Sequence, residues 1–448
     1  MRVLALAPYP YEAASTRFRL GQFVPALAAQ GIDVKIRPFI DGPTFRVLYQ
    51  PSARGRAALG LLRGAAGRLA DLVRARDADV VLVLREAVIA GPPVVEVLAT
   101  AIGRCPLVLD LDDATCVPYR SPTHGRRGTA LKSPRKAFTL IDRAAAVTCG
   151  SRHVAELVAA RGGHAVLLAP AVDLDLFRPR PSATAGARVP VVGWVGTHST
   201  FLYLRAVLPA LAAVAGQHAF RLRIVGAGPP APVPPGLDVE WRDWSLAREA
   251  EDFASLDVGL HPLPAGDAWA EGEAGLKAVQ YMASGVPFVM SPAGSAAELG
   301  RPGTTHLLAE DAGWEAALDR LLDVARLRAR MGAAGREHTV AHHSVEAGRG
   351  DHGRCPTGGR VMSRHPRLAL LDATSVAIGD GASIGHGNLV VDVSRLVLGP
   401  GRHRRAQPGP GGDEVRLGAG SELRRRNIAE TPWVIDDVSR DLSYVGVR

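Results

Sequence analysis

Hydrophobic residues gather in short runs that alternate with stretches where they recur every three or four positions. The runs predict buried strands, and the spaced pattern predicts helices with one apolar face. Such alternation is typical of a doubly wound parallel sheet. In the first part of the chain the predicted strands are Val3–Ala7, Ile32–Ile36, Val80–Leu84, Leu107–Leu111 and Ala146–Thr148.

The alternation restarts after a proline-rich stretch near residues 178–189. We therefore expect an α/β chain with two Rossmann-like domains, residues 1–180 and 188–345, that face each other across a cleft. Ligands of such sheets bind beyond the carboxyl ends of the strands, which border this cleft. The strands predicted for the second domain are Val191–Val195, Leu222–Val225, Val239–Trp241, Val258–Leu260 and Phe288–Met290.

The pattern changes after about Ser344. Apolar residues then recur every six positions, and this period predicts a parallel β-helix. Stacked repeats need several neighbours to bury a core, and the register holds for about one coil before Arg402. Residues 346–448 are thus expected to form a degenerate hexapeptide module or a disordered tail. The repeating positions are Ile378, Ile384, Val390, Leu396, Leu417 and Leu423.

Composition narrows the classes of function. The formal net charge is +9, yet aromatic residues make up 5% of the chain and do not interleave with the basic clusters, which argues against stacking on nucleic-acid bases. A basic surface still favours anionic partners such as nucleotide phosphates, lipid headgroups or acidic glycans. The four cysteines lie far apart without metal-ligand spacing, so we expect a cytoplasmic protein with no metal site and no cofactor.

The segment from Gly272 to Met290 is the most informative part of the sequence. Two glycines open a turn, a helix follows, and Gly285-Val-Pro287 ends the helix before a strand. A helix start with free N–H groups and a nearby lysine suits an anion. An ordinary amphipathic surface helix explains the spacing equally well. One face of the helix carries Glu273, Lys277, Gln280 and Ser284.

Two further glycine turns follow predicted strands, at Gly196–Thr200 and at Gly226–Gly228. A glycine after a strand is often only a turn. Together with the Gly272–Gly275 turn they predict one crevice for phosphates and a nucleotide, where Thr197, Ser199 and Thr200 add hydroxyl groups. Lys277 provides a compact charge suited to a diphosphate.

In the first domain, polar side chains follow the predicted strands. Carboxylates at the end of a strand can orient sugar hydroxyls or an attacking group, and Asp-Asp can equally begin a helix. The arginines could reach a ligand or remain solvated at a helix start. These residues are Ser15, Arg17, Arg19, Arg85, Glu86, Asp110, Asp112 and Asp113.

Two stretches are rich in basic residues, Leu59–Arg76 and Tyr119–Lys136. The first predicts a helix with one apolar face made by Leu62, Ala66, Leu69 and Val73. Packing of that face on the sheet is the commoner explanation for such a helix. A basic amphipathic face also allows peripheral contact with an anionic membrane, here the inner membrane face.

Taken together, these residues resemble glycosyltransferase family 4, the retaining nucleotide-sugar transferases of GT-B fold, over roughly residues 1–345, and several segments are similar to a bacterial subgroup of that family. The most specific match is Leu276–Pro287, which is similar to the family's helix after its EX7E motif. Weaker matches are Val192–Thr197, Asp257–Pro264 with Trp269, Pro8–Pro10, Arg85-Glu86 and Asp110–Asp113. The tail weakly resembles hexapeptide acyltransferases, with His386 as a base in that comparison.

The sequence also departs from the family pattern. The two glutamates of the motif fall on Gly272 and Gln280, and Trp194 and Ser199 stand where many members carry an Arg and a Lys. By analogy Gln280 would bind the donor ribose through its amide, and Lys277 with the helix dipole would stabilise the departing diphosphate. The predicted closing helix, Arg326–His343, is cut short before Gly348, which puts bracing between the domains in doubt.

The resemblance implies a hexosyltransferase-type enzyme of polysaccharide biosynthesis. It would move a sugar from a nucleotide-diphosphate sugar to a glycan or lipid-linked acceptor with retention. A nucleotide-sugar binding protein without transfer activity and a nucleotide-sugar epimerase are the alternatives. The implied catalytic residues are Lys277, Asp112 and Asp113, and the acceptor-binding residues are Ser15, Arg17, Arg19 and Arg85. The implied donor-binding residues are Gly196, Thr197, Ser199, Thr200, Gly226, Gly228, Gly272, Glu273, Ala274, Gly275, Leu276 and Gln280.

Overall fold

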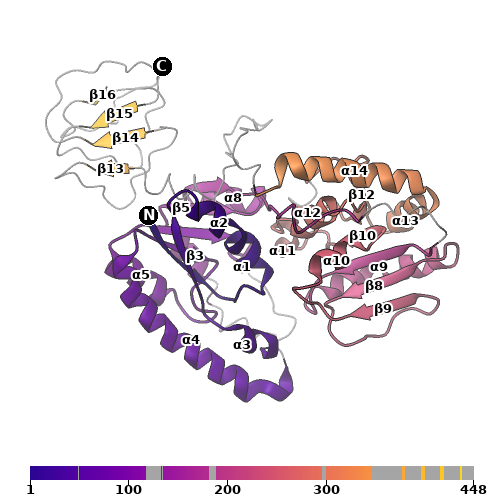
Figure 1. Cartoon of the computed structure of the whole chain (residues 1–448), viewed down its shortest axis with the longest axis horizontal. Helices are drawn as coiled ribbons and strands as arrows, with labels where there is room; N and C mark the ends of the chain where they lie inside the picture. The colour runs from indigo at the N-terminus through magenta and orange to yellow at the C-terminus, as the bar shows by residue number, and fades with distance from the viewer. Residues whose placement is uncertain are drawn as a thin grey trace. The chain divides into compact units, whose positions relative to one another are not determined.

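The computed structural model describes residues 1–48, 50–117, 133, 135–180, 188–294 and 299–345, and four short strands beyond them. The chain forms two compact units, Met1–Pro366 and Arg367–Arg448. The first unit contains both predicted Rossmann-like halves (Figure 1).

The first half is built on a six-stranded sheet in the order β2-β1-β3-β4-β5-β6. Every strand pair in it is parallel. The order reverses between β1 and β3, which is the topological switch point where ligands bind in such sheets. The strands are β1 (Arg2–Ala7), β2 (Asp33–Pro38), β3 (Val80–Leu84), β4 (Leu107–Leu111), β5 (Ala146–Cys149) and β6 (Ala165–Leu167).

The second half repeats this arrangement with the sheet order β12-β11-β10-β7-β8-β9, again all parallel. Its switch point lies between β7 and β10. The strands are β7 (Val191–Val195), β8 (Arg221–Val225), β9 (Asp238–Arg242), β10 (Val258–His261), β11 (Phe288–Met290) and β12 (Leu307–Leu308). The predicted fold class is confirmed for both halves, and β6 and β12 are strands that the hydrophobic pattern did not reveal.

Helices connect the strands and cover both sheets (Figure 1). In the first half they are α1 (Ala14–Arg19), α2 (Val24–Ala28), α3 (Gly42–Val47), α4 (Arg54–Arg74), α5 (Val94–Gly103), α7 (Arg135–Ile141) and α8 (Arg152–Ala160), with short 3-10 turns at Gly21–Phe23, Pro51–Ala53 and Ala75–Asp77. In the second half they are α9 (Phe201–Ala215), α10 (Glu249–Ala254), α11 (Ala268–Glu271), α12 (Leu276–Ala283), α13 (Gly313–Asp323) and α14 (Ala325–His342).

The central strands of each sheet, such as β3 and β7, are buried on both faces and consist of apolar residues, whereas β2 and β9 at the edges are partly exposed and carry charged residues. In the second half, Trp194 of β7 is 1% exposed and its ring meets Phe201 edge-on, with the ring centres 6.1 Å apart. Phe201 in turn packs edge-on against Trp241 of β9 at 5.6 Å. These aromatic contacts fix the start of α9 against the sheet, next to the loop that follows β7.

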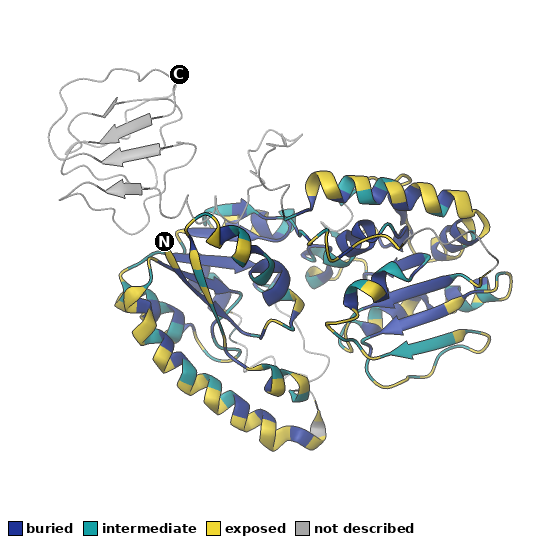
Figure 2. Cartoon of the chain, in the orientation of Figure 1, coloured by how far each residue is buried: buried dark blue, intermediate teal, exposed yellow. Residues whose placement is uncertain are grey.

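Helix α4 packs on the first half through the face opposite to its apolar stripe, contrary to what its apolar pattern predicts. Its inner face consists of Ala57, Gly60, Gly64, Arg68 and Asp71, whereas the apolar stripe through Leu62 and Leu69 is exposed (Figure 2). The glycines allow close approach, because a Cβ on Gly60 would lie 2.1 Å from the Thr44 hydroxyl and one on Gly64 would lie 2.1 Å from the Phe39 carbonyl oxygen.

A buried arginine replaces the expected apolar packing of α4. Arg68 donates to the carbonyl oxygens of Ala7 and Ala87 at 2.8 Å each and to that of Arg37 at 3.0 Å. It also pairs with Asp71 at 2.8 Å. The prediction that the Leu62–Val73 face packs on the sheet is therefore wrong, since hydrogen bonds from the opposite face hold the helix in place.

The helix α12 is buried rather than amphipathic at the surface. Every residue from Ala278 to Ala283 is buried, because α14 lies against it. A left-handed Gly275 (φ 75°) precedes the helix, and a left-handed Gly285 (φ 67°) follows it, as the glycine pattern predicts. The interpretation of this segment as an ordinary surface helix is wrong.

The end of α14 returns to the segment that follows the first sheet. Val172 forms a parallel bridge with Ser344, and its N–H donates to the carbonyl oxygen of His343 at 2.9 Å. Arg336 of α14 donates to the carbonyl oxygens of Phe177 and Ala283 at 2.6 and 2.7 Å. The bracing that the sequence put in doubt is therefore present, because the contacts are complete before Gly348.

The second unit contains a four-stranded parallel sheet in the order β13-β14-β15-β16. Its strands are β13 (Val376–Ile378), β14 (Arg395–Leu398), β15 (Glu414–Leu417) and β16 (Val434–Ile435). Leu396 pairs with Val376 on one side and Val415 on the other, so the stack continues past Arg402. The repeat positions Ile384, Val390 and Leu423 and the suggested base His386 lie outside the described residues, and the hexapeptide module remains a prediction.

Among the described residues, no helix is long and apolar enough to cross a membrane. The basic stretch Tyr119–Lys136 lies mostly outside the described residues; its described part begins α7 and includes Lys136, which is buried.

We expect Arg336→Met to lower the free energy of unfolding by about 2–3 kcal/mol. The substitution removes a charged donor and leaves carbonyl groups of two segments without their partner. Urea denaturation measures the change. Arg326→Met is the matched control, since Arg326 lies exposed on the same helix and the structure gives it no hydrogen bond. Equal stability of the two variants would contradict this role for Arg336.

Candidate functional site

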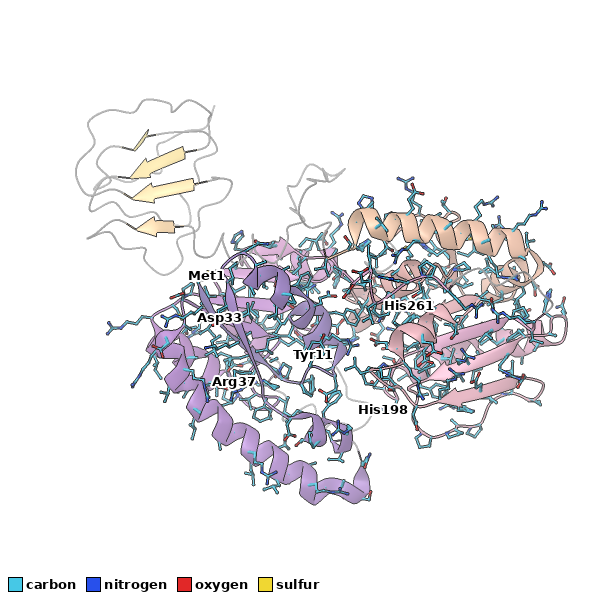
Figure 3. All side chains as sticks on the ribbon, in the orientation of Figure 1. Met1, Tyr11, Asp33, Arg37, His198 and His261 are labelled. Atoms are coloured by element: carbon cyan, nitrogen blue, oxygen red, sulfur yellow. The ribbon has the colours of Figure 1, made fainter. Side chains whose placement is uncertain are left out.

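The carboxyl ends of both sheets border one cavity of about 680 Å³. Loops after β1, β3 and β4 line it from the first half, and the loops after β7 and β8 with the start of α12 line it from the second. Its volume is in the range of small-molecule sites. Figure 3 shows Tyr11 and His198 on the facing sides of the two halves, and His261 inside the second half.

The loop after β7 presents a cluster of hydroxyl groups to this cavity. The Thr197 hydroxyl lies 2.9 Å from that of Ser199 and 3.3 Å from that of Thr200. Thr200 precedes Phe201, the first residue of α9, so the cluster sits at the start of a 15-residue helix. Hydroxyl groups next to a helix start can share the backbone N–H donors in binding an anion.

The loop after β8 approaches the loop after β7 closely. Gly226 has a left-handed backbone with φ 81°, and a Cβ there would lie 2.2 Å from the carbonyl oxygen of Gly196. Only glycine fits, because the approaching atom belongs to the backbone. Gly196 and Gly226 both line the cavity, and their contact joins the two glycine turns into one wall.

Gln280 points into the cavity from α12 and is 3% exposed. Its side-chain nitrogen is buried without a hydrogen-bond partner. A buried amide N–H group that lacks a well-formed hydrogen bond lowers the stability of the folded protein. Because this amide lines the cavity, an acceptor atom of a bound ligand could complete its hydrogen bonding. The nitrogen does not reach an acceptor with good geometry, but the amide still interacts with the carboxyl group of Glu249, which also lines the cavity.

Lys277 is paired with a carboxylate. Its ammonium group donates to Glu273 at 2.7 Å, and the same Glu273 oxygen lies 3.6 Å from His261. Burial lowers the pKa of His261 to about 4, so the ring is neutral near pH 7. Burial opposes ionisation of Glu273, yet the Lys277 charge outweighs it and holds the pKa of that carboxyl below its usual value. Glu273 and Lys277 thus form a charged pair on the cavity wall.

An arginine with a left-handed backbone organises the first-half wall. Arg85 has φ 57°, and its guanidinium bonds to both Asp112 and Asp113. Burial acts against both carboxylates, but Arg85 outweighs it at Asp112 and keeps the pKa of that group below its usual value. Burial, with Asp112 and Glu273 nearby, raises the pKa of Asp113 to about 6. The two aspartates therefore differ in proton affinity.

A buried ion pair joins the two halves beside the cavity. Arg17 of α1 donates through one nitrogen to both carboxylate oxygens of Glu249 of α10, at 2.8 and 2.6 Å. The two side chains are 3% and 8% exposed. The Arg17 guanidinium also lies over the rings of Phe18 and Trp244, and the Trp244 ring nitrogen donates to Glu249 at 3.2 Å.

Arg19 is likewise engaged within the protein. It bonds to Asp110 through two nitrogens at 2.8–3.2 Å and donates to the carbonyl oxygen of Leu168 at 2.6 Å. Thr148 donates to the same Asp110 at 2.6 Å. Arg19 and Asp110 therefore tie the ends of β4, β5 and β6 together, and part of the arginine still lines the cavity.

The structure brings most of the residues singled out by the sequence to this cavity. Of the residues expected to act in catalysis, donor binding or acceptor binding, Arg17, Gly228 and Gly272 do not line it, and neither does the strand-end residue Asp110. Arg17 is turned to Glu249, and Gly272 is pressed against the first half, where a Cβ would lie 2.3 Å from that of Ala114. The family glutamate expected at Gly272 would not fit here. The residues that do line it are Ser15, Arg19, Arg85, Asp112, Asp113, Gly196, Thr197, Ser199, Thr200, Gly226, Glu273, Ala274, Gly275, Leu276, Lys277 and Gln280.

Several lining residues escaped the sequence analysis. Glu249 and Trp244 follow the predicted strand Val239–Trp241 but lie in a segment without a glycine turn, and Phe45 comes from the short helix after β2. Lys136 stood among basic residues, but it points inward and bonds to Glu86 at 3.2 Å. The one feature of the sequence that could have indicated Trp244 and Glu249 is their position shortly after the end of a predicted strand.

The described lining is richer in carboxylates than in cations. The carboxylates are Glu12, Glu86, Asp112, Asp113, Glu249 and Glu273, and the cations are Arg19, Arg85, Lys136 and Lys277. The described residues include no cluster of three or more His, Cys, Asp or Glu arranged to hold a metal ion.

We expect Arg17→Met and Glu249→Gln each to lower the free energy of unfolding by about 3 kcal/mol, because each leaves a buried partner without its counter-charge. The double variant should lose less unfolding free energy than the sum of the two single losses. Urea denaturation of the wild type, both single variants and the double variant gives the coupling energy between the two side chains. A parallel cycle on the exposed pair Arg178–Asp175 should couple by less than about 1 kcal/mol. Additive losses at Arg17 and Glu249 would contradict a direct ion pair.

Stability should depend on pH through Asp113. Its pKa is about 6 in the folded chain against 3.8 ordinarily, so the folded protein binds a proton that the unfolded chain releases. Relative to Asp113→Asn, the wild type should lose up to about 2 kcal/mol of unfolding free energy as pH rises from about 4 to about 6. Denaturation at several pH values measures this, and parallel curves for the two proteins would refute the raised pKa.

Known proteins resemble this chain in sequence over one segment and in fold over both halves. Residues 189–325 match the sequence model of a family described as Glycosyl transferases group 1. No curated protein matches the sequence.

Three solved structures illustrate the likeness in fold. Alr3699/HepE of Anabaena, in complex with UDP and glucose, is 17% identical with a TM-score of 0.52, over 77% of this chain and 95% of its own. Sucrose-phosphate synthase (tll1590) of Thermosynechococcus elongatus is 16% identical with a TM-score of 0.56, over 78% and 96%. A glycosyltransferase from Rickettsia africae ESF-5 is 13% identical with a TM-score of 0.52, over 77% and 94%. The two parallel six-stranded sheets thus have the GT-B fold, and the match to the group 1 glycosyltransferase model lies in the second half.

Proposed function

We propose that this chain is a glycosyltransferase that moves a hexose from a nucleotide-diphosphate sugar to a glycan or lipid-linked acceptor, with retention at the anomeric carbon. The observation that carries the proposal is the cavity at the facing strand ends, which gathers the glycine turns after β7 and β8 and the start of α12. The group 1 glycosyltransferase match covers all of these second-half elements.

The second half would hold the donor. Alr3699/HepE has the same fold and is described in complexes with UDP and glucose and with UDP-glucose. In this chain the N–H groups at Gly275–Lys277 and the Thr197–Thr200 hydroxyl groups would receive the diphosphate. The buried amide of Gln280, which also interacts with the Glu249 carboxyl group, would donate to a ribose hydroxyl.

The departing diphosphate would be stabilised mainly by Lys277. Its pairing with Glu273 at 2.7 Å fixes the ammonium group at the cavity wall while it remains 21% exposed. A fixed cation stabilises developing charge without reorganising during the reaction. A diphosphate oxygen that replaces Glu273 as a partner would draw the full charge of the lysine toward the leaving group.

The first half would hold the acceptor. Ser15, Asp112 and Asp113 lie on its side of the cavity, and Arg85 fixes the two aspartates. The acceptor hydroxyl would attack the anomeric carbon on the face that the diphosphate leaves, and a diphosphate oxygen would take its proton. The protein then contributes position and charge stabilisation.

The pKa of about 6 at Asp113 favours one alternative of a different class. A carboxyl group that exchanges protons near neutral pH suits the acid and base steps of a nucleotide-sugar epimerase. A nucleotide-sugar binding protein without turnover is the other alternative, favoured by the excess of carboxylates over cations in the described lining.

Incubation of the purified protein with UDP-, GDP- and ADP-sugars separates the three functions. Transfer or hydrolysis with release of nucleoside diphosphate supports the proposal. An isomeric nucleotide sugar without such release would replace it with the epimerase. A thermal shift without any turnover, in the presence of a range of glycan and lipid-linked acceptors, would replace it with the binding protein.

Lys277→Met should lower kcat about 100- to 1000-fold, in line with the loss of one preorganised contact to developing charge. The dissociation constant for the donor should change far less, because hydroxyl and backbone donors remain. Lys277→Arg should retain more of the activity than Lys277→Met. The surface variant Lys35→Met controls for the loss of a lysine (side chain 72% exposed). An unchanged kcat in Lys277→Met excludes this role.

A further inference from the structure

The outer face of α4 carries an exposed apolar stripe. Leu62, Leu69 and Val73 are 69%, 68% and 60% exposed, and Leu59 is 48% exposed. Their spacing places them on one side of the helix with Ala66 between them. From Leu59 to Val73 the stripe extends over about 21 Å of the helix, which is more than a single scattered surface leucine would expose.

A second stripe lies on the helix that packs against α4. In α5, Val94, Leu98 and Ile102 recur every four residues and are 54%, 42% and 38% exposed. The two helices contact each other, and both show exposed residues on their outer sides (Figure 2). We call the exposed residues of α4 and α5 the outer helix face.

The charges that α4 and α5 themselves present outward are basic, while two exposed carboxylates border the face, Asp41 near Arg63 and Asp77 just after α4. Arg56, Arg63 and Arg74 follow one border of the α4 stripe, and Arg54 lies on the other side. The acidic residues of these two helices, Asp71 and Glu96, are both buried. Asp71 is bonded to Arg37, Arg68 and Arg74, so α4 presents no carboxylate outward.

The way α4 is held explains why the stripe faces outward. Gly60 and Gly64 approach the first half so closely that a Cβ would meet Thr44 or Phe39 at 2.1 Å. Buried Arg68 is bonded to three carbonyl groups of that half. A rotation of α4 that buried Leu62 and Leu69 would break all of these contacts. The contacts of the inner face therefore keep the apolar side of the helix exposed.

We infer that the outer helix face docks on the surface of an anionic lipid bilayer. The leucine and valine side chains would enter the acyl boundary while the arginines contact headgroup phosphates, which is the arrangement of helices that lie in a membrane interface. A second copy of the chain fits this face poorly, since two such stripes would bring their arginine borders together. Helix α3, which packs on α4, contributes Phe45 to the cavity, so docking would bring the acceptor side of the cavity near the lipid.

Sedimentation of the full chain with vesicles tests the inference. The wild type should partition onto vesicles of phosphatidylcholine with about one third phosphatidylglycerol, and at least about tenfold less onto phosphatidylcholine alone. Leu62→Ser combined with Leu69→Ser should weaken partition at least about tenfold. Leu157→Ser combined with Val340→Ser removes two exposed apolar residues elsewhere and should have no effect.

Charge is tested with a second matched pair. Arg54→Gln, Arg56→Gln and Arg63→Gln together should weaken partition on the order of a hundredfold, at about fivefold for each arginine near the surface. Arg320→Gln, Arg326→Gln and Arg330→Gln make the same change in net charge on exposed positions of α13 and α14. Equal losses in the two triple variants would reduce the effect to net charge and overturn the inference.

Two other outcomes would also overturn it. If the Leu62→Ser/Leu69→Ser variant melts like the wild type and binds the vesicles equally well, the apolar stripe is not the surface that contacts the membrane. A wild type that self-associates in light scattering, and a stripe variant that does not, would assign the face to a second copy of the chain. Neither measurement uses turnover, so both stand apart from the proposed glycosyl transfer.

Discussion

The buried ion pair between Arg17 and Glu249 is the contact on which the cavity depends most. Two charged groups removed from water must satisfy each other, because neither has another full counter-charge within reach. Since Arg17 belongs to the first half and Glu249 to the second, the pair sets the distance between the loops that carry Asp113 and Lys277. Gly272, in contact with Ala114, and the hydrogen bond from Ser151 to the Gly272 carbonyl at 3.1 Å add a second point of contact.

The same constraint accounts for what the donor motif lacks. A glutamate at position 272 would collide with the first half, and the glycine there allows the closely packed arrangement. The amide at Gln280 sits beside the Glu249 carboxyl group, where a second carboxylate would add repulsion in a buried place. Gly272 and Gln280 thus each suit their surroundings, the one by its close packing on Ala114 and the other by its place beside the Arg17–Glu249 pair.

Sequence patterns predicted the two parallel sheets well, because buried strands such as Val80–Leu84 consist of uninterrupted apolar residues. They also located the glycine turns, whose positive φ at Gly226 and Gly275 only glycine adopts freely. They failed for α4, because a stripe of leucines does not reveal that glycines and a buried arginine make the inner face. They also missed Glu249, since its partner Arg17 is more than two hundred residues away in the chain.

The central claim is that a nucleoside diphosphate binds at the starts of α9 and α12. A crystal structure of the chain with the nucleoside diphosphate that raises its melting temperature most tests this directly. The account predicts the diphosphate within hydrogen-bond distance of the N–H groups at Gly275–Lys277 and the Thr197–Thr200 hydroxyl groups, with the ribose beside Gln280. A diphosphate bound to Arg85 on the first half, or outside the cavity, would contradict it.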